Sequence, residues 1–373
     1  MTWRPTESQV LLVRAAVLPG DAALEAWHQW RAQGGVDDVD PASHRLFAQV
    51  YRNLPQLGID EPAVAALREA YGESWSRNQQ LLHHAGRVLA DLHDAGIATL
   101  VLKGAALAAL HYPDVGARPM DDVDVLVAPA QVEEAMRVLQ RAGWSPGREV
   151  TWSPADNPRA LIPVRHAIAF DDEAGHQLDL HWYSLWQSAP DDAFWQTAVP
   201  LTIAGVQTRA LDPTDQLLHV CVHGCGRAPG PVRWVADAGM LVRPEGPGID
   251  WDRLVDAART RRLSLITERA LRVVQTELGL DVPPAALAAL RHTRTTPHER
   301  WGDRVTIRPP KHGGMYVAAW DRYRRLRALD PSGPTPSGFA LYLQRLLGLR
   351  SRWGLVRQVA RNAGNAVRSR LGR

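Results

Sequence analysis

The chain of 373 residues has few cysteines, almost no lysine and no long apolar run. Its two cysteines, Cys221 and Cys225, are too few for a disulfide scaffold and are typical of a reducing cytosol. Charged residues or glycines interrupt the apolar runs before they reach bilayer length, and the N-terminal segment lacks the features of a signal peptide. We therefore expect a cytoplasmic protein with no membrane span.

Arginine replaces lysine almost throughout: of 43 basic residues, only Lys103 and Lys311 are lysines. Codon bias accounts for most of this excess. Because an ammonium and a guanidinium are not interchangeable at a phosphate site, Lys103 is still a candidate for a specific role. Residues 331–373 carry eight arginines and no acid. This basic tail could contact an acidic partner, but a solvated tail is the favoured interpretation, and nucleic acid is not an expected partner.

Apolar spacing and the breaks at proline and glycine divide the chain into four regions. Residues 1–95 predict an N-terminal helical subdomain, and residues 96–211 predict a core of strands and helices. Residues 212–330 are helical again, and residues 331–373 form a linker and the basic tail. The expected fold class is α+β, with a small mixed β-sheet between N- and C-terminal helical regions.

Short β-branched runs in the core predict its strands. The first lies in residues 97–103 and stops at Lys103-Gly104, where a helix begins. A second covers residues 123–127. Two more, in residues 164–170 and 176–182, are joined by a tight Asp-Glu-Ala-Gly turn, and residues 199–211 predict a further hairpin that turns at Gly205.

Aspartates alternate with valines in the second strand. Asp122 and Asp124 point to one face and the valines to the other, because successive side chains of a strand alternate. Two adjacent carboxylates repel each other unless a cation lies between them. Asp179 has the same alternation on a later strand, and if the two strands are neighbours the three carboxylates could hold two Mg²⁺ ions. A bare Asp-x-Asp, by contrast, is more often a solvated strand edge.

The turn at Lys103-Gly104 is the second element of the pattern. Glycine lets the backbone approach a phosphate closely, and a helix N-terminus offers free N–H groups and a positive dipole. A strand, a Lys-Gly turn, a helix, an Asp-x-Asp strand and a later aspartate strand form a far more specific series than any one of them.

This series, written LKGAALAALHYPDVG, MDDVDVLV and LDLHW, resembles the nucleotidyltransferase superfamily related to DNA polymerase β. Within it, the chain is similar to a bacterial branch of uncharacterised nucleotidyltransferases, over about residues 80–245. The resemblance implies that Asp122 and Asp124 bind two Mg²⁺ ions and that Asp179 completes the catalytic metal site. It implies that Gly104 lies under the triphosphate, with Ala105 in place of a serine that commonly supplies one phosphate hydrogen bond. Lys103 and Arg118 become candidate phosphate contacts.

The implied reaction is transfer of a nucleotidyl group from an NTP, such as ATP, to a hydroxyl or phosphate on a small molecule or peptide. Some members of the branch resemble tailoring enzymes of ribosomal peptides such as lasso peptides, which would make the acceptor a peptide. Two alternatives remain open: glycosyl transfer from a sugar nucleotide on the same fold, and a non-catalytic scaffold that binds a peptide.

Several histidines could add to this site. His181 could act as a base or orient Asp179, and His223 could face the cleft, with Arg165 and His166 as weaker candidates. A zinc site that combines His219 and His223 with the two cysteines is disfavoured, because the two pairs lie on different faces of one helix.

Two arginines near Asp237 have competing interpretations. Arg233 and Asp237 are four residues apart, which favours a surface ion pair on a helix. Alternatively, Arg227 and Arg233 could contact a phosphate or an acidic acceptor.

Overall fold

The computed structural model describes residues 4–34, 36, 39–54, 63–147, 161–186, 191–225, 232–307, 313–331, 335–349 and 351–371. Within them it contains seventeen α-helices and one seven-stranded mixed sheet. The prediction of a mixed sheet with helices before and after it is confirmed. The sheet is larger than expected, because a short strand that the sequence did not suggest, β3, extends one edge.

The strand order of the sheet places the predicted carboxylates side by side. The order is β3-β4-β5-β2-β1-β7-β6, and the central strand β2 pairs with β1 antiparallel and with β5 parallel. In this register Asp124 lies opposite Asp179. The strand bounds are β1 Leu100–Leu102, β2 Asp122–Leu126, β3 Ser145–Pro146, β4 Ala167–Asp171, β5 Gln177–His181, β6 Val199–Ile203 and β7 Val206–Ala210.

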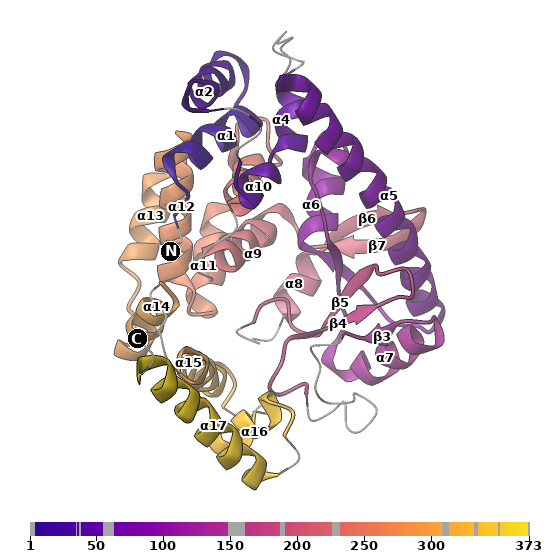
Figure 1. Ribbon diagram of the computed structural model, residues 1–373, viewed down its shortest axis with the longest axis vertical. Helices are drawn as coiled ribbons and strands as arrows, with labels where there is room; N and C mark the ends of the chain where they lie inside the picture. Colours follow the sequence, from indigo (N-terminus) through magenta and orange to yellow (C-terminus); the bar gives the residue numbers. More distant parts are fainter. Residues whose placement is uncertain are drawn as a thin grey trace.

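Two helices cover one face of this sheet. Figure 1 shows α5 (Ala63–Asp94) along the outer side of the strands, with α7 (Val132–Arg141) beside it. The valines of β2 and the leucines of β5 are buried against these helices. Since side chains alternate along a strand, the aspartates of both strands face the other way. The helix α5 stops just before Gly96, which has a positive φ of 72°.

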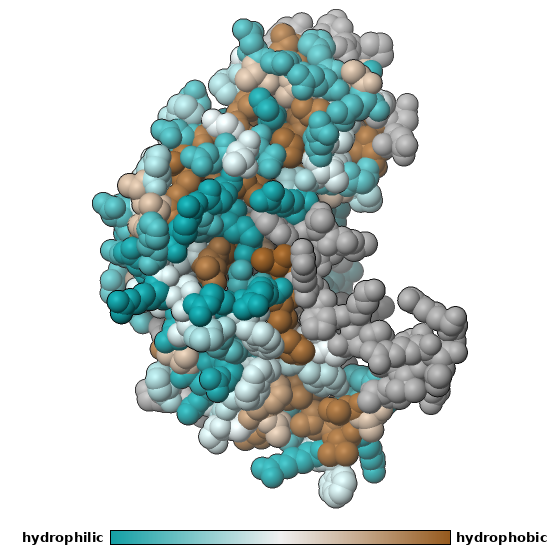
Figure 2. Space-filling view, turned by 90° about the vertical axis from the view of Figure 1, so that its left-hand side faces the viewer, coloured by the Kyte–Doolittle hydropathy of each residue, from teal (hydrophilic) through white to brown (hydrophobic). Residues whose placement is uncertain are grey.

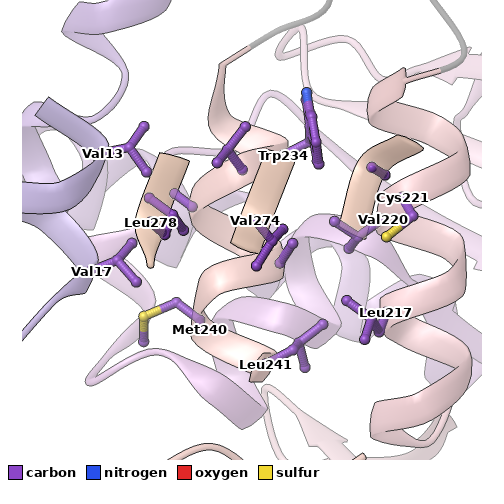
Figure 3. Packing of buried hydrophobic residues seen from close by; sticks show 14 of the residues in the cluster. Val13, Val17, Leu217, Val220, Cys221, Trp234, Met240, Leu241, Val274 and Leu278 are labelled. Atoms are coloured by element: carbon purple, nitrogen blue, oxygen red, sulfur yellow. The ribbon is translucent and has the colours of Figure 1, made fainter. Parts of the chain in front are cut away.

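A helix near the N-terminus and helices from residues 213–278 share a second hydrophobic core. Figure 3 shows side chains of α1 (Glu7–Val17), α9 (Pro213–Cys225), α10 (Arg233–Val242) and α12 (Ser264–Leu278) packed together. Cys221 is fully buried there and packs as a small apolar residue. Because α1 belongs to the first predicted region and α9, α10 and α12 belong to the third, these two regions share one core. The boundaries of the four regions stay predictions.

The remaining helices are short or lie at the periphery of the fold. Their bounds are α2 Gly20–Gln33, α3 Pro41–His44, α4 Phe47–Asn53, α6 Lys103–His111, α8 Asp192–Thr197, α11 Trp251–Thr260, α13 Pro284–Arg291, α14 Pro297–Ile307, α15 Gly314–Leu329, α16 Phe339–Leu346 and α17 Arg352–Leu371. None of the helices in the described ranges is long and apolar enough to cross a membrane.

The basic tail contains the helix α17. Of three apolar residues at helical spacing that could dock it, only Leu355 is buried, whereas Trp353 is 75% exposed and Val359 is also exposed. Apolar side chains gather at the lower end of the face in Figure 2, at the height where α16 and α17 lie in Figure 1. Residues 332–334 of the predicted linker lie outside the described residues.

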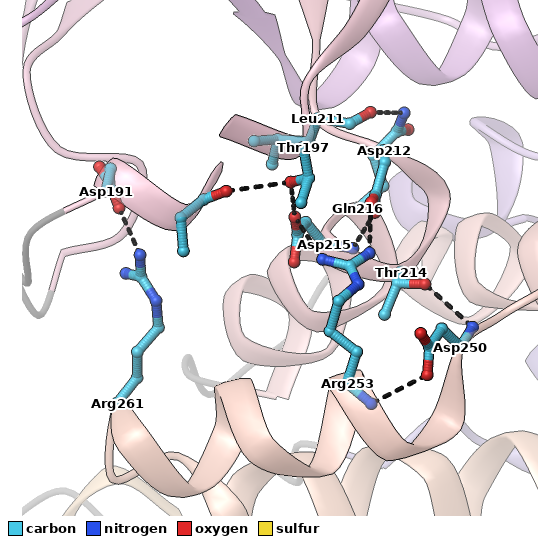
Figure 4. Close-up of polar contacts among 11 residues, drawn as sticks. Asp191, Thr197, Leu211, Asp212, Thr214, Asp215, Gln216, Asp250, Arg253 and Arg261 are labelled. Atoms are coloured by element: carbon cyan, nitrogen blue, oxygen red, sulfur yellow. Dashed lines mark hydrogen bonds and ion pairs between the residues drawn. The ribbon is translucent and has the colours of Figure 1, made fainter. Parts of the chain in front are cut away.

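Partly buried polar contacts hold the position of α9. Figure 4 shows Arg253 of α11 binding Asp215 at 2.9 Å and also Asp212, which precedes α9. The backbone N–H of Asp250 donates to Thr214 Oγ1 at 3.1 Å. These contacts hold the N-terminal end of α9 against α11, and α9 carries two histidines that reach the site described next.

Candidate active site

A cavity of about 510 Å³ lies between the aspartate-bearing face of the sheet and helices α9 and α10. This volume is in the range of small-molecule sites. Its lining combines acids from the strands with bases from the helices and loops: Lys103, Gly104, Arg118, Asp122, Asp124, Arg165, His166, Asp179, His219, His223 and Arg233. Most of the residues that the sequence singled out therefore meet around one space.

The junction of β1 and α6 presents Lys103 to this cavity. Lys103 has a φ of 46°, a left-handed conformation that residues other than glycine seldom adopt. Its Nζ lies 2.5 Å from Asp124 Oδ1. Burial alone would lower the pKa of Lys103, but Asp124, Asp122 and Asp179 together raise it above its ordinary value. Lys103 is therefore a partly buried ammonium with a strained backbone, surrounded by carboxylates.

Asp124 is the most tightly held of the three acids. It is 1% exposed, and its Oδ1 receives both Lys103 and His181 Nε2, the latter at 2.9 Å. Burial would raise the pKa of Asp124, but Lys103 and His181 hold it far below its ordinary value. The histidine thus orients Asp124, and not Asp179, which was one of the two roles left open for it. His181 is 1% exposed and is not among the described residues that line the cavity.

The other two acids lie beside Asp124. Ligand atoms of Asp124, Asp179 and His181 all lie within 4.8 Å of one another, and Gln177 Nε2 donates to Asp179 Oδ1 at 3.1 Å. Burial, followed by the charge of Asp124, raises the pKa of Asp122 to about 6. Three carboxylates thus share one ammonium, which leaves an excess of negative charge on oxygen ligands. This donor set fits a hard divalent cation such as Mg²⁺.

Arg118 lines the cavity but is already paired. Its Nε and Nη2 donate to the two carboxylate oxygens of Asp237 at 2.7 and 2.8 Å, and Tyr112 Oη donates to the same carboxylate at 2.6 Å. The predicted surface ion pair of Arg233 with Asp237 is wrong, because Asp237 is buried and pairs with Arg118. A Cβ on Gly104 would lie 2.8 Å from Arg118 Nη1, so only glycine leaves room for this guanidinium.

Arg233, which begins α10, has a different environment. Its Nη1 donates to the carbonyl oxygen of Pro119 at 2.7 Å, and within the described residues no carboxylate forms an ion pair with it. Burial, followed by repulsion from Arg118, lowers the pKa of Arg233 to about 10. Arg233 is therefore a cation that faces the cavity without a carboxylate on its guanidinium. Arg227, the other arginine of that hypothesis, lies outside the described residues.

A chain of buried contacts supports the far wall of the cavity. His219 Nε2 lies 2.8 Å from the carbonyl oxygen of Ser184, whose N–H and hydroxyl donate to Asp191 at 2.6 and 2.8 Å. Asp191 in turn pairs with Arg261 at 2.9 Å (Figure 4). Burial, followed by the charge of Lys103, lowers the pKa of His219 to about 4. The sequence suggested no link among these residues.

The remaining predicted residues have distinct positions. Ala105 is 1% exposed and its methyl group packs in the core beneath the sheet, so only its backbone could reach a ligand. His223 lines the cavity, with its ring 6.2 Å from that of His219. Gly224 lets α9 and α10 meet, because a Cβ there would lie 2.1 Å from the Trp234 ring.

Comparison with known proteins gives one family. Residues 42–279 match the family described as uncharacterised nucleotidyltransferase. The match covers more than half of the chain and includes the sheet, the three aspartates, α9 and α10. No curated protein matches the chain.

Proposed function

Because this chain belongs to the family of uncharacterised nucleotidyltransferases, we propose that it moves a nucleotidyl group from an NTP to a hydroxyl or phosphate acceptor with the help of Mg²⁺. One observation carries the proposal. Asp122, Asp124 and Asp179 face a cavity of suitable size with more negative charge than Lys103 balances. The order of strand, Lys-Gly turn, helix and aspartate strands supports a place in the superfamily related to DNA polymerase β.

The carboxylates would hold the metal. Asp122 and Asp179 would offer their oxygens directly, and Asp124 its second oxygen, because Lys103 and His181 bind Oδ1. Bound Mg²⁺ would neutralise charge on the triphosphate and on the leaving group. Lys103 and His181 keep Asp124 ionised and in one orientation, which prepares the site before the nucleotide enters.

The opposite wall would hold the phosphates. Arg233 supplies a cation whose guanidinium has no carboxylate partner in the described residues, and Gly104 at the start of α6 lets a phosphate approach backbone N–H groups. Arg118, whose charge Asp237 balances, keeps Nη1 beside Gly104, where it would act as a hydrogen-bond donor to the same phosphate. Ala105 supplies no hydroxyl, so one phosphate hydrogen bond must come from elsewhere.

The reaction forms one phosphorus–oxygen bond and breaks another. An acceptor oxygen attacks the α-phosphorus of the NTP, the bond from that phosphorus to the bridging oxygen of the β-phosphate breaks, and pyrophosphate leaves. Asp179 would take the proton of an acceptor hydroxyl. A peptide is one acceptor class within this proposal, and a ribosomal peptide of the lasso type is its most specific form.

The experiment pairs each of the four NTPs and Mg²⁺ with small hydroxyl, phosphate and peptide acceptors, and measures pyrophosphate release and product mass. We expect one NTP to give a product heavier by a nucleotidyl group, and Asp179→Asn to abolish it. Asp171→Asn, on the neighbouring strand β4 and outside the cavity, is the matched control. A product carrying a sugar instead would replace the proposal with glycosyl transfer. Mg²⁺ affinity unchanged in Asp122→Asn/Asp124→Asn would favour the non-catalytic scaffold.

A further inference from the structure

A second group of metal-ligand residues lies on the other face of the sheet from the cavity. His84 comes from α5, and Asp172 and His176 come from the turn between β4 and β5. Along β5, His176 has the parity of Leu178, which faces α5, whereas Asp179 has the opposite parity and faces the cavity. The two groups therefore flank the same strand from opposite faces.

The three side chains converge on one point. His84 Nδ1 and His176 Nδ1 lie 3.2 and 2.8 Å from the same oxygen, Asp172 Oδ2. The ligand atoms all lie within 4.8 Å of one another. In a tetrahedral site with metal–nitrogen bonds of about 2.0–2.1 Å, neighbouring ligand atoms are separated by roughly 3.3 Å. To bind a metal ion, these atoms would move slightly apart and the stacked rings would turn so that both Nδ1 lone pairs point toward the ion.

The surroundings hold the ligands in place. The backbone N–H of His176 donates to Asp172 Oδ1 at 2.8 Å, which turns Oδ2 toward the two imidazoles. The imidazole rings are stacked with centroids 4.0 Å apart and planes 28° apart. All three residues are partly buried, on two elements that meet in the fold. Such orientation by a contact behind the ligand is usual at metal sites.

The chemistry of the donors differs from that of the active site. Burial, followed by the charge of His176, lowers the pKa of His84, which favours the neutral imidazole that binds metals. Two imidazoles and one carboxylate suit zinc and related transition metals, whereas Mg²⁺ prefers oxygen ligands.

We propose that His84, Asp172 and His176 bind a transition metal ion, with Zn²⁺ as the representative, and that this ion clamps the β4–β5 turn onto α5. The clamp would hold the start of β5, three residues before Asp179. A three-residue ligand set leaves the fourth position to water. The competing explanation is that the two histidines and the aspartate bind only one another.

The experiment titrates the full-length chain, stripped of metal by a chelator, with Co²⁺ and then with Zn²⁺. Visible absorption reports Co²⁺ coordination, and the midpoint of thermal unfolding reports stabilisation by Zn²⁺. The variants are His84→Ala and His176→Ala, and His93→Ala on the exposed side of α5 is the matched control. Asp124→Asn removes a possible ligand at the cavity and leaves His84, Asp172 and His176 intact. It therefore shows at which of the two groups the metal binds.

We expect the native chain, His93→Ala and Asp124→Asn to bind Zn²⁺ with a rise in the unfolding midpoint. His84→Ala and His176→Ala should bind at least tenfold more weakly and lose that rise. The proposal is overturned if both variants keep native affinity, or if Asp124→Asn alone abolishes all binding. Circular dichroism checks folding, and His84→Gln replaces either variant that does not fold, because His84 lies near the surface. Since no readout uses turnover, this outcome is independent of the proposed reaction.

Discussion

The two walls of the cavity carry opposite charges and were visible in the sequence to different degrees. The sheet wall presents Asp122, Asp124 and Asp179, whereas the opposite wall presents histidines and arginines from α9, α10 and the loop before β2. The acids follow a local alternation along two strands. The bases come from segments about a hundred residues apart, and their roles depend on which partner each one meets.

The arginines show this dependence most clearly. Arg118 and Arg233 line the same cavity, but Arg118 is neutralised by Asp237 and Arg233 is not. One is a structural ion pair, and the other remains a cation that a triphosphate could use. A residue type alone therefore does not define a phosphate contact, because the neighbouring carboxylates decide what charge is left.

The largest effect should come from the sheet wall. We expect Asp124→Asn or Asp179→Asn to lower turnover by roughly 10²–10³-fold or more, because each removes a carboxylate that would hold Mg²⁺ at the reacting phosphate. Pyrophosphate release under saturating NTP measures this loss. If both variants keep turnover within a few-fold of native, Asp124 and Asp179 do not take part in catalysis.

The next largest effect should be a difference in unfolding free energy between variants of Arg118 and Arg233. Arg118→Ala leaves Asp237 buried without its partner, which costs about 3–5 kcal/mol of unfolding free energy. Arg233→Ala loses a hydrogen bond to a carbonyl, which costs about 1 kcal/mol. Urea denaturation of both variants measures the difference. Equal losses would mean that the two arginines do not differ in the way the structure indicates.

A fall in pH should lower the free energy of unfolding through protonation of His219. Its pKa is lowered from 6.5 to about 4 in the fold, so the unfolded chain binds a proton more readily between these values. The stability from this group is full above pH 6.5 and is lost as the pH falls toward 4, by about 3 kcal/mol in total. Unfolding free energies at several pH values measure the slope. His219→Gln should show a shallower loss over the same range, and an unchanged slope would contradict the assignment.

The smallest effect should be on nucleotide affinity. We expect Arg233→Ala to raise the KM for the NTP about tenfold with little change in kcat, because it removes a contact made before and during the reaction. Arg233→Lys should restore part of the affinity, since a cation remains. Steady-state kinetics with varied NTP measures both, and a fall in kcat at constant KM would instead place Arg233 at the reacting phosphate.

Much of the sheet wall could be predicted from short stretches of sequence. The strand before Lys103, the alternation of Asp122 and Asp124, and the strand that carries Asp179 all follow from local rules on propensity and side-chain direction. The three aspartates converge only if β2 and β5 are neighbours. The sequence left this pairing open, and the structure shows it.

The partners of the buried charges could not be predicted in the same way. The helical spacing of Arg233 and Asp237 favoured an ion pair, but Asp237 is buried and the guanidinium of Arg118 reaches it across 119 residues. One of the two roles open for His181 was to orient its strand neighbour Asp179, yet its Nε2 binds Asp124 on the adjacent strand. Spacing along one element describes which side chains share a face, and not which group from another element meets them.

The sequence by itself determined six of the seven strands, the faces on which the aspartates lie, and the resemblance to nucleotidyltransferases. The tertiary structure alone decided that Lys103 binds Asp124, that Arg118 is neutralised and Arg233 is not, and that His84 meets Asp172 and His176. The physical reason is the range of the forces involved. Strand alternation and helix signals act over a few residues, whereas burial and ion pairing depend on segments that only folding brings together.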